Sequence, residues 1–190
     1  NNQCTVINGT CTESETSCGG GSGSGVTYVE CSSCTECNGA PHVRIPDGTS
    51  FIATRAFEGC TTLKSVVIPD SVTTIRIFAF HRCYSLESVV INADSLTTIE
   101  LGIFEACNNL VSLDIRGNIT SIGRDMFSGC SSLEEIVLPG SVTSIGDRAF
   151  KGCGKLTEVV IPDNVQSIGE EAFTGCGNLT EVVIPDSVQS

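Results

Sequence analysis

Apolar and polar positions follow one repeating pattern from about residue 42 onward. Each unit contains the pattern L-x-x-V-x-I and then a V-x-x-I pair, as at Leu156, Val159, Ile161, Val165 and Ile168. The end of the first pattern alternates apolar and polar residues, which is the period of a β-strand with one buried face. We therefore expect one short strand in every unit.

The residues after the strand predict how each unit turns back. Pro162 lacks an N–H group and ends a strand, while Asp163 and Asn164 favour a turn because their side chains bond nearby backbone groups. Val165 and Ile168 begin a second short extended or turn segment. The run Gly-x-x-Ala-Phe-x-Gly-Cys that follows is typical of a tight return of the 3₁₀ or short helical kind.

Phenylalanine and cysteine mark the period of the repeat. Both series advance by 23, 24, 23, 23 and 23 residues. The six phenylalanines are Phe57, Phe80, Phe104, Phe127, Phe150 and Phe173, and the six cysteines are Cys60, Cys83, Cys107, Cys130, Cys153 and Cys176. Such a unit lies within the roughly 20 to 29 residues of leucine-rich repeats, and stacked units share a core that one unit cannot form.

We therefore predict an α/β-type repeat solenoid of leucine-rich repeats, right-handed, with parallel stacked short strands and turn or 3₁₀ returns. Its strand cores end at Ile45, Ile68, Ile91, Ile115, Leu138, Ile161 and Ile184. The solenoid is expected to span residues 42–190, the last unit being incomplete.

Residues 1–41 differ in kind and are predicted to form a cysteine-rich N-terminal cap. They contain few large apolar residues, too few to offset the chain entropy lost on ordering. Their six cysteines, which allow three disulfides in 15 pairings, are Cys4, Cys11, Cys18, Cys31, Cys34 and Cys37. A disulfide-bonded cap would shield the core of the first repeat from water.

A zinc site is the alternative for this segment. Cys31-x-x-Cys34-x-x-Cys37 would supply three thiolates, and Cys18 or His42 the fourth ligand of a tetrahedron. Disulfides are favoured because many cysteines in a short segment are typical of an oxidising compartment.

The repeated run S-V-x-x-I-G-x-x-A-F-x-G-C resembles the BspA-type leucine-rich repeat family. It is clearest at residues 141–153 and 165–176, and the resemblance covers residues 43–190. The family occurs in surface and secreted proteins of bacteria and protists, which implies cell-surface adhesion and binding of other proteins. Two units depart from the pattern: Asn92 and Arg116 replace the proline after the strand, and the unit before Cys107 has one extra residue.

The repeat cysteines are predicted to form a ladder of buried thiols. Their side chains would run parallel along the core and would not converge as a disulfide requires. Unpaired cysteine is among the most buried residue types, and one thiolate per unit cannot surround a metal ion. Cys60 is included in this prediction, together with the five cysteines that follow it.

The outward side of the strands is the candidate protein-binding strip. Its residues lie between the last two core positions of each strand: Val67, Val90, Asp114, Val137, Val160 and Val183. Glu135, Glu158 and Glu181 flank the later valines. An exposed apolar row can bind a partner. A purely structural role is the alternative, since β-branched residues suit strands.

Charge and motifs exclude other functions. A net charge of −12 disfavours nucleic acid and anionic membranes, and no stretch of about 18 apolar residues is present. Neither His42 nor His81 lies in a catalytic motif, so we expect no enzyme activity, cofactor or metal. Three N-x-[ST] sequons, at Asn8, Asn118 and Asn178, are candidates for N-glycosylation.

The sequence thus predicts an extracellular or cell-surface protein that binds other proteins through its stacked strands. The alternative is a structural subunit that assembles end to end into a fibre or matrix, since contacts that do not close build filaments.

Overall fold

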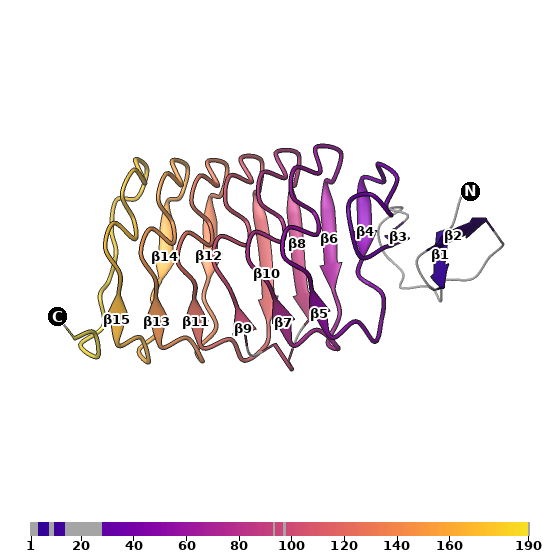
Figure 1. Ribbon diagram of the computed structural model, residues 1–190. Coiled ribbons are helices and arrows are strands. Elements are labelled where there is room, and N and C mark those ends of the chain that lie inside the picture. Colours follow the sequence, from indigo (N-terminus) through magenta and orange to yellow (C-terminus); the bar gives the residue numbers. More distant parts are fainter. Residues whose placement is uncertain (1–3, 8–9, 14–27, 93, 97, 190) are drawn as a thin grey trace.

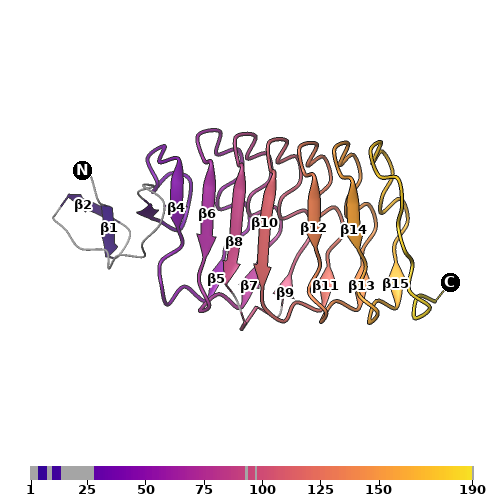
Figure 2. The ribbon, with the colours of Figure 1, turned by 180° about the vertical axis from the view of Figure 1, so that it is seen from behind.

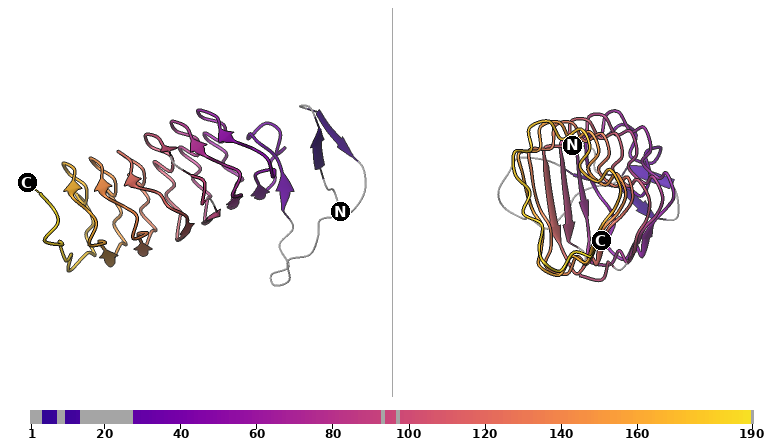
Figure 3. Two further views of the ribbon diagram at one scale, coloured as in Figure 1. Left: turned by 90° about the horizontal axis from the view of Figure 1, so that it is seen from below. Right: turned by 90° about the vertical axis from the view of Figure 1, so that its left-hand side faces the viewer.

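The chain folds as an elongated solenoid of stacked, similar coils. The computed structural model describes residues 4–7, 10–13, 28–92, 94–96 and 98–189. Figure 1 shows the coils in sequence order along one axis, and the end-on view of Figure 3 shows them superimposed around a common core. The described residues contain strands and turns and no helix, so none of them forms a helix that could cross a membrane.

Two rows of parallel strands run along the solenoid. The longer strands are β3 (Val29–Glu30), β4 (His42–Arg44), β6 (Ser65–Ile68), β8 (Ser88–Asn92), β10 (Ser112–Arg116), β12 (Glu135–Val137) and β14 (Glu158–Val160). The shorter strands are β5 (Phe51–Ile52), β7 (Thr74–Ile75), β9 (Thr98–Ile99), β11 (Ser121–Ile122), β13 (Ser144–Ile145) and β15 (Ser167–Ile168). The V-x-x-I pairs of the sequence end in this second row (Figure 2).

An antiparallel hairpin lies before the first stacked strand. It consists of β1 (Cys4–Ile7) and β2 (Thr10–Glu13) and lies at the β3 end of the stack in Figures 1 and 2. β3 pairs in parallel with β4, as every later long strand of this sheet pairs with its neighbour. The stacked sheet therefore begins inside residues 1–41, the segment assigned to the cap.

The returns between coils explain why no helix forms. Two positions in each return have positive φ, for example Arg55 and Gly59 in one coil and Asp125 and Gly129 in another. A residue in this left-handed region cannot continue a right-handed helix. Each return is instead a chain of tight turns, with bonds such as Glu58 N–H to Arg55 O at 3.1 Å. The α/β class and the helical return are therefore not confirmed, whereas the parallel stacked strands are.

Phenylalanine and cysteine fill two adjacent columns of the core. The rings from Phe57 to Phe173 stack with neighbouring centroids 4.9 to 5.9 Å apart. The thiols of Cys83, Cys107, Cys130, Cys153 and Cys176 are buried and free, and each donates to the carbonyl of the phenylalanine one coil earlier. The cysteine column thus links the polar backbone of adjacent coils inside an apolar core.

Cys60 differs from the other repeat cysteines and from our prediction. It forms a disulfide with Cys34, while Cys31 pairs with Cys37. The reason is positional: Cys34 N–H bonds Ala56 O just as Phe57 N–H bonds Ala79 O, so Cys34 occupies the phenylalanine column of the first coil. A thiol there lies beside Cys60, where a phenyl ring would otherwise pack.

These two disulfides also argue against the alternative of a zinc site. Cys31, Cys34 and Cys37 are all oxidised, so none of them supplies a thiolate to a metal ion. Cys18 lies outside the described residues and the side chains of Cys4 and Cys11 are not described, so the participation of these three cysteines in disulfides stays a prediction.

Both rows of strands are interrupted at one coil. β10 pairs with β8 and has no ladder to β12, while β11 pairs with β13 and has none to β9. The coil between Cys107 and Cys130 therefore pairs with the preceding coil through β10 and with the following coil through β11. The extra residue lies one coil earlier, between Ile91 and Leu96. The returns remain bonded across the interruption, as by Phe104 N–H to Met126 O at 3.0 Å.

Candidate functional site

The outward residues of the long strands form one continuous surface, which we call the strand face. Alternation along each strand places two side chains per coil on it. In chain order they are His42 and Arg44, Ser65 and Val67, Ser88 and Val90, Ser112 and Asp114, Glu135 and Val137, Glu158 and Val160, and Glu181 and Val183. The register aligns the first members of these pairs in one row and the second members in another.

The valine row changes from buried to exposed along the solenoid. Val67 is only 7% exposed, so the structure removes it from the exposed strip that the sequence predicted. Val90 and Asp114 are partly buried. Val137, Val160 and Val183 are 76%, 55% and 69% exposed, which makes them the main apolar contact surface of the strand face.

The N-terminal part of the strand face is occupied by internal contacts. Ser65 is buried, and its hydroxyl lies 2.8 Å from Nδ1 of His42. Arg44 lies over the ring of Tyr28, with its guanidinium carbon 5.7 Å from the ring centroid. These groups are already satisfied within the chain, so we place the candidate site in the later coils.

Asp114 marks the boundary between the two parts. Arg116 occupies the position that Pro139 occupies in the next unit. Its Nη2 lies 2.6 Å from Oδ2 of Asp114. This contact raises the pKa of Arg116, first through the hydrogen bond and then through the opposite charge. The departure from the repeat pattern noted in the sequence thus creates an ion pair on the strand face.

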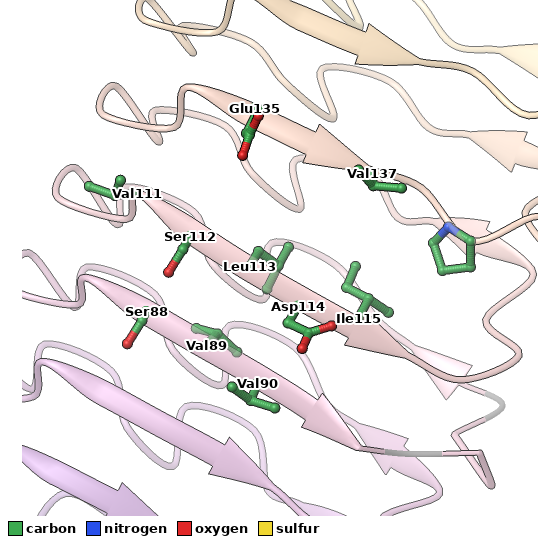
Figure 4. A pocket seen from close by; sticks show the side chains of 11 residues that line it. Ser88, Val89, Val90, Val111, Ser112, Leu113, Asp114, Ile115, Glu135 and Val137 are labelled. Atoms are coloured by element: carbon green, nitrogen blue, oxygen red, sulfur yellow. The ribbon is translucent and has the colours of Figure 1, made fainter. Parts of the chain in front are cut away.

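A groove crosses the interruption of the sheet. It has a volume of about 370 Å³ and is lined by side chains of β8, β10 and β12, among them Val90, Asp114 and Val137. Figure 4 shows Ser112 and Asp114 on the side of β10 opposite to Leu113 and Ile115. The groove is therefore lined by outward residues of the strand face together with the inward side chains of Val89, Leu113 and Ile115, and it lies between Asp114 and the exposed Val137.

A second groove lies on the same face in the last coils. Its volume is about 550 Å³, and its lining includes Glu158, Val160, Asp163, Glu181 and Val183. Apolar methyl groups and carboxylates thus line the same depression. Such a surface offers apolar contact together with hydrogen-bond acceptors of negative charge.

The glutamates of the strand face lack cationic partners. Glu135 and Glu158 are directly opposite each other in the parallel register, and both are exposed, as is Glu181. Within the described residues no ion pair joins any of the three to Lys, Arg or His. Like charges directly opposite each other destabilise a sheet, so this row does not serve the stability of the stack.

The other candidate groups lie away from the strand face. The thiols of Cys107 and Cys130 are buried; burial raises the pKa of both, to about 12 for Cys130, which makes them poor nucleophiles at neutral pH. His81 bonds Glu58 at 2.9 Å and lowers the pKa of that carboxyl. In the part of the chain that the structure describes, no three His, Cys, Asp or Glu side chains cluster as metal ligands.

The sequons are placed only in part. Asn118 follows β10 and is exposed, and Asn178 is exposed in a turn before the last coil. Asn8 lies outside the described residues. Both described asparagines are accessible to modification, which keeps glycosylation as a prediction.

Parallel stacked strands, a 23-residue period and an aliphatic core define a leucine-rich repeat solenoid. The model of the BspA-type leucine-rich repeat region matches residues 27–157 and 143–190 in 6 copies. The chain therefore belongs to the BspA-type leucine-rich repeat family, as its repeated motif predicted.

Solved structures of bacterial leucine-rich repeat proteins share this fold. The T. pallidum protein TpLRR is 33% identical, with a TM-score of 0.74 over 84% of this chain and 75% of its own. A protein from Eubacterium ventriosum is 26% identical, with a TM-score of 0.71 over 76% of this chain and 39% of its own. One from Bacteroides ovatus, 23% identical with a TM-score of 0.51 over 77% of this chain and 52% of its own, shows the fold alone. No curated protein sequence matches the chain.

Proposed function

We propose that this protein acts at the cell surface or outside the cell and binds another protein through the strand face from β12 onward. The observation that carries the proposal is the exposure of Val137, Val160 and Val183 in one row. A contiguous exposed apolar patch on a protein surface marks an interaction site. Binding, without catalysis, is the action proposed.

Two further features support the location and the kind of function. Proteins with leucine-rich repeats typically mediate protein interactions, and the BspA type is typical of surface proteins. The disulfides Cys31–Cys37 and Cys34–Cys60 fit an oxidising compartment, because cytosolic thiols are kept reduced.

The test is the double substitution Val137→Asp with Val160→Asp. Both side chains are exposed and contribute little to the core, so the fold is expected to persist with a small loss of stability from the two opposed carboxylates, as checked by circular dichroism. Proteins of the native cell surface are captured with the immobilised chain, and their affinities for the unmodified chain and for the variant are then compared. We expect binding at least about tenfold weaker, since burying an unpaired carboxylate in an apolar interface costs well over 1.4 kcal/mol.

A matched control removes apolar surface elsewhere. Ile77 and Tyr84 are exposed and belong to returns, away from the strand face, so Ile77→Asp with Tyr84→Asp should leave binding unchanged. Equal losses in both double variants would contradict the proposed site. Light scattering and electron microscopy of the unmodified chain address the alternative, since fibres of end-to-end copies would favour a structural subunit.

A further inference from the structure

The strand face of the later coils carries two parallel rows of different chemistry. One is the valine row, Val137, Val160 and Val183; the other is the glutamate row, Glu135, Glu158 and Glu181. Neighbouring coils repeat about every 4.8 Å, and alternate residues of one parallel strand lie about 6.6 Å apart, so the rows run side by side along the solenoid axis. A partner on the valine row therefore lies next to the glutamates.

The glutamate row is not required by the repeat itself. The same row of the strand face holds Ser65, Ser88 and Ser112 in earlier coils, whose strands are paired in the same parallel register. Serine thus supports the stack without charge. The change to glutamate coincides with the exposure of the valines, since both begin at β12.

Two other carboxylates beside the strand face are paired within the chain. Glu87 lies 3.4 Å from Lys64 on the neighbouring coil, and Asp114 is paired with Arg116. The three glutamates of the row have no such partner among the described residues. Their charge is therefore available to a cation supplied from outside.

The charge of the surrounding residues also favours a cationic partner. Residues 93–190 contain 14 Asp or Glu and 5 Lys or Arg, against 6 and 5 in residues 28–92. The later half of the solenoid therefore attracts cations as a whole. Nucleic acid and anionic membranes are repelled by this field, which leaves a cationic protein segment as the complementary occupant.

We propose that the strand face from β12 onward binds a basic amphipathic segment of a protein. Its apolar side chains cover the valine row, and its Lys or Arg side chains pair with the glutamate row. The groove of about 550 Å³ that contains Glu158, Val160 and Glu181 receives the centre of the segment, where Asp163 adds a further carboxylate. This inference rests on the proposed function and specifies the chemistry of the partner.

The test selects displayed random peptides on three forms of the intact chain. The first is unmodified, and the second carries Glu135→Lys, Glu158→Lys and Glu181→Lys. The third is a charge-matched control, whose substitutions replace three exposed turn residues of other coils by lysine: Asp47, Asp70 and Asp94. Enriched peptides are sequenced and their affinities measured by fluorescence anisotropy at low and moderate salt.

We expect the unmodified chain and the control to enrich peptides that combine Lys or Arg with apolar residues. These peptides should bind the glutamate-row variant roughly 10- to 100-fold more weakly, because like charges then face each other. Their affinity should also fall with salt. Neutral or acidic peptides enriched on the unmodified chain, equal affinity for the glutamate-row variant, or no enrichment at all would overturn the inference.

The Val137→Asp/Val160→Asp variant separates this result from the proposed function. If it loses the selected peptides while the glutamate-row variant keeps them, the strand face binds protein segments but does not select basic ones. If neither variant loses them, the strand face is not the binding site and both proposals fail.

Discussion

The disulfide between Cys34 and Cys60 should stabilise the solenoid more than the disulfide between Cys31 and Cys37. The two bonds close loops of very different length, with sequence separations of 26 and 6 residues. Chain entropy lost by the unfolded state grows with loop length, which gives about 3.5 kcal/mol for the longer loop and about 2.2 kcal/mol for the shorter. The expected difference is therefore about 1.3 kcal/mol.

Two double variants measure this difference. Cys34→Ser with Cys60→Ser opens the longer loop, and Cys31→Ser with Cys37→Ser opens the shorter one. Free energies of unfolding are obtained from urea titrations followed by circular dichroism, after peptide mapping has established which bonds are present. A smaller loss for the Cys34–Cys60 variant than for the Cys31–Cys37 variant would refute the entropic reasoning.

A third variant tests the positional explanation of this bond. Cys34 occupies the phenylalanine column, so Cys34→Phe should restore the ring stack of the repeat and leave Cys60 as a buried thiol like Cys83. We expect this variant to recover part of the stability that Cys34→Ser with Cys60→Ser loses. A loss equal to that of the serine variant would show that the first coil cannot hold an aromatic ring.

Two other predictions follow from the core and the returns. Burial raises the pKa of the thiols of Cys107 and Cys130, so both should resist iodoacetamide at pH 8 until the protein unfolds, which labelling kinetics would check. Because the folded pKa lies above the unfolded thiol pKa of about 8.5, the stability of the protein should be greatest below pH 8.5 and fall as the pH rises towards 12, which melting curves would check. Ala106 has a φ of 60°, so Ala106→Gly should raise stability by about 0.5–1 kcal/mol, whereas Ala149→Gly, at a buried position without positive φ, should lower it by about 1–2 kcal/mol in the same melts.

The spacing of Phe and Cys and the strand pattern were enough to predict a leucine-rich repeat solenoid, its parallel stacking and most of its core, and the resemblance of the run S-V-x-x-I-G-x-x-A-F-x-G-C indicated the family. A repeated apolar position faces the core in every coil or in none. The alternation around Val159 therefore identified Glu158 and Val160 as outward residues. A signal for the Cys34–Cys60 bond was also present, since Cys34 and Cys37 precede Phe57 and Cys60 by 23 residues each. Because all six N-terminal cysteines were assigned to one cap, the bond between Cys34 and Cys60 was not predicted.

The sequence predicted turn or 3₁₀ returns, and the described returns are tight turns without a helix. The residues with positive φ that exclude a helical return are hard to identify from sequence. Glycine marks the position in some coils, but Arg55, Phe78, Arg148 and Glu171 adopt positive φ as well. The bonds to adjacent coils hold these residues in place, as when Arg55 N–H donates to Ile77 O at 3.0 Å. Tertiary contacts there override the local preference of the side chain.

The sequence by itself determined the repeat, since only residues that return with a fixed period can build a continuous core from short units. The tertiary structure alone decided which outward residues are accessible. Val67 and Val137 occupy the same position in their units, yet one is buried and the other is mostly exposed. Exposure depends on what packs over a residue from elsewhere in the chain, and a repeat pattern carries no information about that.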